Sequence, residues 1–202
     1  MVMRYFKITA AIALAGVAAL AAAGQANAAP GSATASTAAV AEIHNGLNVA
    51  LLDGKITLQL PQDFVDQTPK DKTPQDTGVA VQLFANRQHS QVVGISTVRT
   101  VNGDANDTGE SAFNKMAQGA LSGLKTQFKD VKKTGQTTVM AGDHKFLRID
   151  SEQEMKDNAM IGTLLITPYH DRVITVQVLS PAAADKEHNA LVKSILNTVS
   201  FH

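Results

Sequence analysis

The chain has 202 residues, no cysteine, and 18 acidic and 18 basic residues. The lack of cysteine excludes disulfide cross-links, thiol catalysis and thiolate metal sites. The even charge balance argues against a nucleic-acid-binding protein, which usually has a clustered basic face. The one adjacent basic pair, Lys132-Lys133, is interpreted as the solvent-exposed start of a strand.

The first 28 residues have the pattern of a secretory signal peptide. Arg4 and Lys7 give a positively charged start, residues 8–23 are apolar and rich in alanine, and Ala26-Asn27-Ala28 has the small-x-small pattern of a cleavage site. The apolar run is short for a membrane span, and it lacks the polar face of a buried helix. We therefore expect export, with cleavage near Ala28.

The part that remains after cleavage has 174 residues, enough for one domain with a hydrophobic core. It carries 16 basic and 18 acidic residues, because Arg4 and Lys7 lie in the signal peptide. A lipid anchor at the new N-terminus would require a cysteine, and Ala23 stands where such a cysteine would be expected. We expect a soluble protein without a lipid anchor.

The region after the signal peptide divides in two. Residues 29–48 are rich in Ala, Ser, Thr and Gly, which predicts a flexible leader. Residues 49–202 show no internal linker and are expected to form a single domain. Its first strand is predicted from the apolar residues Ile56, Leu58 and Leu60, which alternate with polar ones. Pro61 ends this strand.

Three further features follow in the first half of this domain. Residues 61–77 are polar and contain prolines, which predicts an exposed loop and the best candidate for a contact surface. Val79–Ala85 and Val92–Val101 are apolar and flank a short polar segment, which predicts a β-hairpin.

The clearest predicted helix runs from Thr108 to about Lys129, with Thr108 and Ser111 near its N-cap. Its apolar residues recur every three or four positions, so one face should pack on a sheet. The same stripe could instead line a groove for an apolar ligand. The stripe comprises Phe113, Met116, Ala117, Ala120, Leu121, Leu124 and Phe128.

The second half predicts four closely spaced strands and a final helix from Pro181 to about Thr198. Strands joined by such short turns run antiparallel. The predicted fold is therefore α+β, an antiparallel β-sheet with two main helices packed on it. The strands are expected at Thr137–Met140, Lys145–Ser151, Met160–Thr167 and Arg172–Leu179.

Histidine spacing predicts no metal site. The sequence has neither an HExxH motif nor two histidines at i, i+4. His89, His144 and His170 fall in predicted turns, and a metal enzyme would require these three distant turns to meet. The six histidines are His44, His89, His144, His170, His188 and His202.

No other pattern predicts catalysis or a cofactor. There is no GxSxG motif, and Ser122 with Lys125 matches SxxK only inside a predicted helix, whereas that motif opens one. The glycines form no phosphate-binding loop after a strand. Asp150, Glu152 and Glu154 alternate on one strand and could bind a cation, but a solvated strand face is the favoured explanation, because polar residues alternate in this way on ordinary antiparallel sheets.

One segment resembles a known family. Residues 51–61, Leu-Leu-Asp-Gly-Lys-Ile-Thr-Leu-Gln-Leu-Pro, followed by Asp63 and Asp66-Gln67, are similar to the opening of the DcrB family of bacterial envelope proteins. The turn Gly142-Asp143-His144-Lys145 and the ending from Ile195 to Val199 agree with that family in layout. The likeness covers about residues 49 to 201.

The resemblance implies a PsbP-like α/β sandwich in a periplasmic protein of the cell envelope. It also implies a role in bacteriophage adsorption or DNA entry and in envelope homeostasis. No catalytic, cofactor-binding or metal-binding residues come with it. DcrB-like proteins are commonly lipoproteins, and Ala23 departs from that pattern.

We therefore expect a non-enzymatic accessory protein that acts by contact with an envelope protein partner, with no nucleic acid, no metal and no cofactor. Its oligomeric state is not fixed by the sequence. Two alternatives stay open, a carrier of a small apolar ligand bound between helix and sheet, and a hydrolase or metal enzyme assembled from distant turns.

Overall fold

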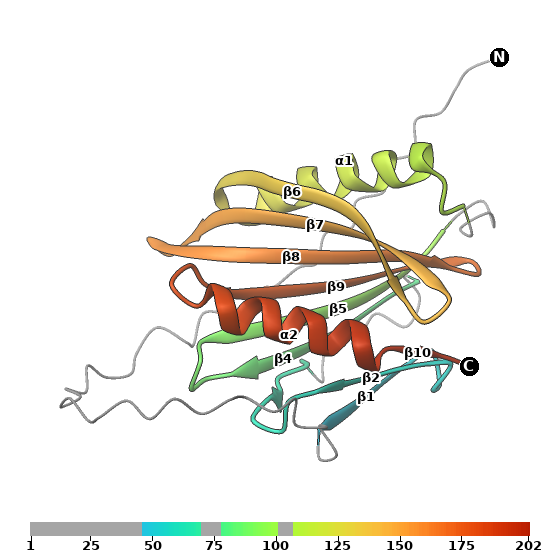
Figure 1. The fold of residues 1–202 in the computed structure, drawn as a ribbon, viewed down its shortest axis with the longest axis horizontal. Coiled ribbons are helices and arrows are strands. Elements are labelled where there is room, and N and C mark those ends of the chain that lie inside the picture. The colour runs from blue at the N-terminus through green and yellow to red at the C-terminus, as the bar shows by residue number, and fades with distance from the viewer. Residues whose placement is uncertain (1–45, 70–77, 101–106) are drawn as a thin grey trace.

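The computed structural model describes residues 46–69, 78–100 and 107–202 (Figure 1). Within these residues the chain forms ten strands and two helices. Their order is β1 (Leu47–Leu51), β2 (Ile56–Leu60), β3 (Val65–Asp66), β4 (Val79–Asn86), β5 (Gln91–Arg99), α1 (Glu110–Gln127), β6 (Lys129–Ala141), β7 (His144–Met155), β8 (Asn158–Tyr169), β9 (Arg172–Pro181), α2 (Asp185–Thr198) and β10 (Ser200–Phe201).

The strands form two antiparallel sheets. The large sheet has seven strands in the order β3-β4-β5-β9-β8-β7-β6, and the small sheet has the order β1-β2-β10. Short turns join β6 through β9, so these four strands form a meander. In the small sheet β2 lies between β1 and β10, and therefore joins the two ends of the described domain.

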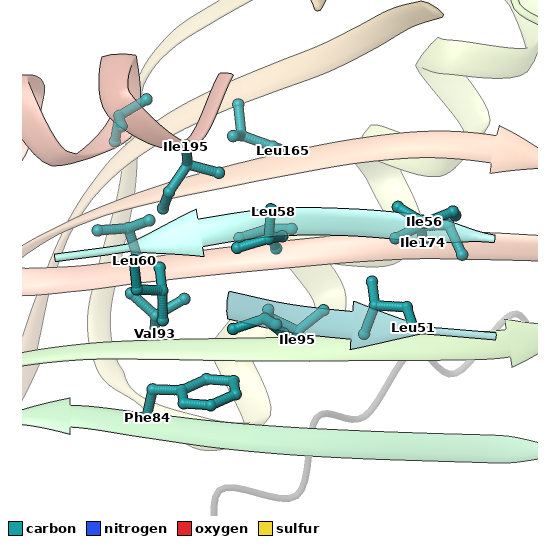
Figure 2. Packing of buried hydrophobic residues seen from close by; sticks show 14 of the residues in the cluster. Leu51, Ile56, Leu58, Leu60, Phe84, Val93, Ile95, Leu165, Ile174 and Ile195 are labelled. Carbon is teal, nitrogen blue, oxygen red and sulfur yellow. The ribbon is translucent and has the colours of Figure 1, made fainter. Parts of the chain in front are cut away.

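One face of the large sheet packs against α2 and the small sheet. Alternation along each strand directs every second side chain to this face. Ile56, Leu58 and Leu60 of β2 are almost fully buried here, together with Ile195 of α2 (Figure 2). Burial of this kind stabilises the fold by roughly 1.5–3 kcal/mol per large side chain. The sheet contributes Phe84, Val93, Ile95, Phe146, Leu165, Ile174, Val176 and Val178.

The opposite face of the large sheet packs against α1. The two helices therefore lie on opposite faces of one sheet (Figure 1). Phe113, Ala117, Ala120 and Leu124 form the buried stripe of the helix. Their partners on the strands are Leu147, Ile149, Leu164, Ile166 and Val173.

The structure confirms the predicted α+β class, the hairpin and both helices, with several corrected boundaries. β1 begins at Leu47, inside the predicted leader. Pro181 ends β9, and α2 begins only at Asp185. The N-cap of α1 is Gly109 and not Thr108 or Ser111, and it makes no side-chain cap hydrogen bond because glycine has no side chain.

Two predicted segments differ more strongly. The strand expected at Thr137–Met140 is the last part of β6, which begins at Lys129; the first part is polar and lacks a simple apolar alternation. The expected loop over residues 61–77 contains β3, which pairs with β4, and Gln67 donates a backbone hydrogen bond to Leu83 over 2.7 Å. Residues 70–77 of that prediction lie outside the described residues. None of the helices in the described ranges is long and apolar enough to cross a membrane.

Candidate functional site

Strand β6 forms one edge of the large sheet, and the other edge belongs to the two-residue strand β3. The first half of β6, residues 129–135, contains three lysines and two register shifts against β7. Lysines and bulges are the features that prevent an edge strand from pairing with another chain. The second half, residues 136–141, pairs with β7 without interruption and has no charged residue. We call this second half the neutral edge.

The neutral edge is open to solvent. Gln136, Thr137 and Thr138 are exposed, and Met140 is 55% exposed. Among the described residues only Val65 is a comparably exposed large hydrophobic residue, at 58%, and it lies on the opposite edge strand β3. Alternate N–H and C=O groups of an edge strand point away from its sheet. The neutral edge thus offers both unpaired backbone groups and an apolar side chain.

A groove of about 470 Å³ runs beside the neutral edge, between β6 and the first half of α1. The side chain of Gln136 donates a hydrogen bond to Asn114 Oδ1 over 3.1 Å and so joins strand and helix. The groove is mostly polar, with one acidic and one basic residue. Its walls are Thr108, Glu110, Phe113, Asn114, Gln136, Thr137, Thr138, Lys145 and Leu147.

A buried hydrogen-bond network holds α2 against the same sheet. His188 of α2 is 3% exposed; its Nδ1 lies 2.9 Å from Ser180 Oγ and its Nε2 lies 2.9 Å from Thr163 Oγ1. The hydroxyl of Thr163 donates to Asp150 Oδ1 over 2.7 Å, and Arg148 Nε donates to both carboxylate oxygens of Asp150 over 2.9 and 3.0 Å.

These contacts fix the tautomer of His188. The hydroxyl of Thr163 already donates to Asp150, so it accepts from His188, and the ring proton lies on Nε2. Nδ1 then accepts from the hydroxyl of Ser180. Burial lowers the pKa of His188, and the nearby Asp150 carboxylate opposes this shift. The neutral ring is therefore the form that the network accommodates.

Ser180, His188 and Asp150 are the residue types of a hydrolase triad, and their surroundings show a structural role instead. Ser180 has no exposed surface, so a substrate carbonyl has no access to its hydroxyl. Thr163 stands between the histidine and the carboxylate. The group is best explained as a polar attachment between α2 and the sheet.

The three turn histidines do not meet. His89 lies in the turn between β4 and β5, whereas His170 lies in the turn at the other end of the neighbouring strand β9. His144 stacks on Phe201 with ring centroids 3.7 Å apart. The described residues contain no group of three His, Cys, Asp or Glu side chains that could hold a metal ion, and His44 falls outside them.

The acidic row on β7 is divided among different partners. Asp150 belongs to the network around His188, and Glu152 forms an exposed ion pair with Lys132 over 3.6 Å. Desolvation, together with hydrogen bonds and like charges from Asp157 and Asp130, raises the pKa of Glu154. The three carboxylates therefore act separately, as expected for a solvated strand rather than a cation site.

The apolar stripe of α1 is largely core. Phe113 is buried, while Leu121 and Phe128 are partly buried against the same cluster. Ser122 and Lys125 lie inside the helix, which agrees with a chance match to SxxK. The described chain shows a small cavity on the other flank of the helix, next to Met116 and Leu124, and not beneath Phe113, Leu121 and Phe128.

Sequence reasoning missed both the neutral edge and the buried network. The exposed residues of β6 resemble an ordinary polar segment, and only the strand order reveals that they lie at an edge. Ser180, Thr163 and His188 come from three elements and share no spacing that could have predicted their contact. The one available signal was a histidine on the apolar side of α2, next to Leu191 and Val192.

Comparison with solved structures shows which proteins share this fold. Cyanobacterial PsbP (CyanoP) from Synechocystis aligns with a TM-score of 0.56 at 8% identity, over 83% of this chain and 98% of that protein. The Ran-binding protein Mog1p of Saccharomyces cerevisiae aligns with a TM-score of 0.52 at 14% identity, over 78% of this chain and 95% of Mog1p.

A third similar structure comes from Bacteroides thetaiotaomicron, with a TM-score of 0.53 at 12% identity over 78% of this chain. The chain spans about half of that protein, 48% of its length. No protein-family model and no curated protein sequence matches the chain. At these identities the comparisons establish the fold, which is the PsbP/Mog1-like α+β fold.

Proposed function

We propose that this chain is an exported, non-enzymatic accessory protein of the DcrB type in the bacterial cell envelope. It acts by binding an extended segment of another envelope protein along the neutral edge of β6. The signal-peptide pattern and the resemblance of residues 51–61 to DcrB proteins support the location. The unprotected, regular second half of β6 is the observation that carries the mode of binding.

The partner segment adds an eighth strand to the large sheet. Backbone hydrogen bonds from residues 136–140 supply affinity, and alternate side chains of the added strand enter the groove beside α1 and supply selectivity. Because the neutral edge is uncharged and the groove has one residue of each sign, Glu110 and Lys145, the expected partner segment is uncharged at its centre. Bacteriophage adsorption and envelope homeostasis are the processes in which such a partner would act.

The substitution Met140→Lys tests this proposal. Lysine on an edge strand opposes strand addition, and the 55% exposure of Met140 means that the fold should tolerate it, with a stability change within about 0.5 kcal/mol. A photo-crosslinking residue at Thr138 should capture a defined envelope protein in living cells. We expect Met140→Lys to reduce that capture at least about tenfold, the effect of losing roughly 1.4 kcal/mol of binding energy.

Val65→Lys is the matched control, since Val65 is equally exposed on the opposite edge strand. It should leave capture unchanged. Equal loss in both variants would indicate a nonspecific effect of charge, and full capture by Met140→Lys would refute binding at the neutral edge. Capture by a photo-crosslinking residue placed within residues 61–69, but not by one at Thr138, would instead restore the loop as the contact surface.

A further inference from the structure

A small cavity lies on the α1 side of the large sheet, between the flank of the helix and strands β8 and β9. It has a volume of about 40 Å³. A water molecule needs about 10–15 Å³ on this scale, so the cavity holds a hydroxyl group and two or three carbon atoms. Its walls are Lys115, Met116, Gly119, Ala120, Leu124, Gln127, Leu164, Ile166, Val173, Thr175 and Gln177.

Two glutamine oxygens of this wall lack hydrogen-bond partners. Gln177, on β9, is 2% exposed, and its Oε1 is buried and accepts no hydrogen bond. Gln127, in the last turn of α1, also has a buried Oε1 that accepts no hydrogen bond. An unsatisfied buried polar group destabilises the folded protein. A buried amide without a partner on a mostly apolar wall lowers the stability of the fold. Its presence therefore points to a ligand that donates a hydrogen bond to it.

The remaining walls define the rest of that ligand. Met116, Leu124 and Leu164 present apolar surface, which favours an aliphatic body. Lys115 is exposed and belongs to the same wall, so its positive charge disfavours cationic ligands. The donor is therefore neutral, and a hydroxyl group is the simplest neutral donor of the required size.

We propose that this cavity binds the hydroxyl end of a slender aliphatic alcohol. The hydroxyl donates to Gln177 Oε1, and Gln127 Oε1 accepts from a second hydroxyl when the ligand is a diol. This site is separate from the neutral edge of β6, so it adds a function that does not depend on the proposed partner binding.

Binding is tested with 1-butanol and diethyl ether, which have the same atomic composition but differ in their ability to donate a hydrogen bond. Each is titrated into the purified protein while the side-chain amide signals of Gln177 and Gln127 are followed by NMR. We expect saturable shifts with 1-butanol, and binding of the ether about tenfold weaker, which corresponds to about 1.4 kcal/mol, because the ether leaves the buried acceptor without a donor.

The variant Gln177→Met keeps the size of the side chain and removes the acceptor. This variant should bind 1-butanol and diethyl ether with the same affinity, and it should be at least as stable as the parent protein. Gln153→Met is the control, since Gln153 is equally buried on β7 but does not line the cavity, and it should keep the difference between the two probes. Equal affinity for both probes, no saturable binding, or an undiminished preference in Gln177→Met would each overturn the proposal.

Discussion

Replacement of Leu58 by alanine is expected to destabilise the protein by about 2–5 kcal/mol. Leu58 is 1% exposed and lies at the centre of β2, in the cluster that also contains Ile95 of the large sheet and Ile195 of α2 (Figure 2). Its removal leaves a cavity where the small sheet, the large sheet and the helix meet. Most domains have only 5–15 kcal/mol of stability, so this loss is a large fraction of the total.

Urea denaturation followed by circular dichroism measures this effect as a change in the midpoint at constant slope. Val65→Ala is the matched control, because Val65 is 58% exposed and its truncation should cost less than about 0.5 kcal/mol. A cost below 1 kcal/mol for Leu58→Ala would mean that the small sheet does not pack as described.

The second large effect is expected in the network around His188. The substitution Thr163→Val keeps the shape of the side chain but leaves His188 Nε2–H without its acceptor, and it removes one of the two groups that donate to Asp150, the other being Arg148 Nε. We expect a loss of about 1–3 kcal/mol, the cost of unsatisfied buried groups. Thr137→Val, at an exposed position, should change stability by less than about 0.5 kcal/mol. Equal effects at the two positions would argue against the network.

The same network makes stability depend on pH. Burial lowers the pKa of His188 below the ordinary value of 6.5, so the unfolded chain binds the proton more readily than the folded chain. The contribution of the neutral ring is therefore fully present above about pH 6.5 and is lost as the pH falls through the lowered folded-state pKa. The charged groups that act on the ring are Asp150 and Asp185, which raise its pKa, and Arg148, which lowers it.

Unfolding free energies measured between pH 7.5 and pH 5 test this dependence. The parent protein should lose stability across this range, and His188→Gln should lose less, because its amide does not titrate. Carboxylates titrate in both proteins and cancel in the comparison. Parallel curves for the two proteins would show that His188 contributes nothing to the pH response.

The fold could be predicted wherever one side of an element is apolar and the other is polar. This pattern identified β2, the β4–β5 hairpin, α1 and the meander from β7 to β9. It failed for the first half of β6, whose exposed edge position removes the apolar alternation. It also failed for β1, β3 and β10, which are short and depend on partners far away in the chain.

The candidate site was much less predictable than the fold. That Met140 stands at an unprotected edge depends on the order of seven strands, which no local pattern contains. Gln177 is indistinguishable in sequence from other polar residues of an antiparallel strand, and only the packing of α1 beside β9 shows that its amide is buried without a partner. Chemistry assembled from separate elements requires the tertiary structure.

The place of β2 between β1 and β10 has a consequence for the order in which the protein can fold. Thr57 contacts His202 across 145 positions of the chain, and β2 also packs against α2. A chain that emerges N-terminus first therefore holds Ile56, Leu58 and Leu60 incompletely buried until α2 and β10 have appeared. Contacts of such long sequence separation slow folding and leave apolar strands exposed in the meantime. The segment that contains α2 and β10 thus completes the core, and its emergence from the ribosome sets the earliest moment at which the native state can form.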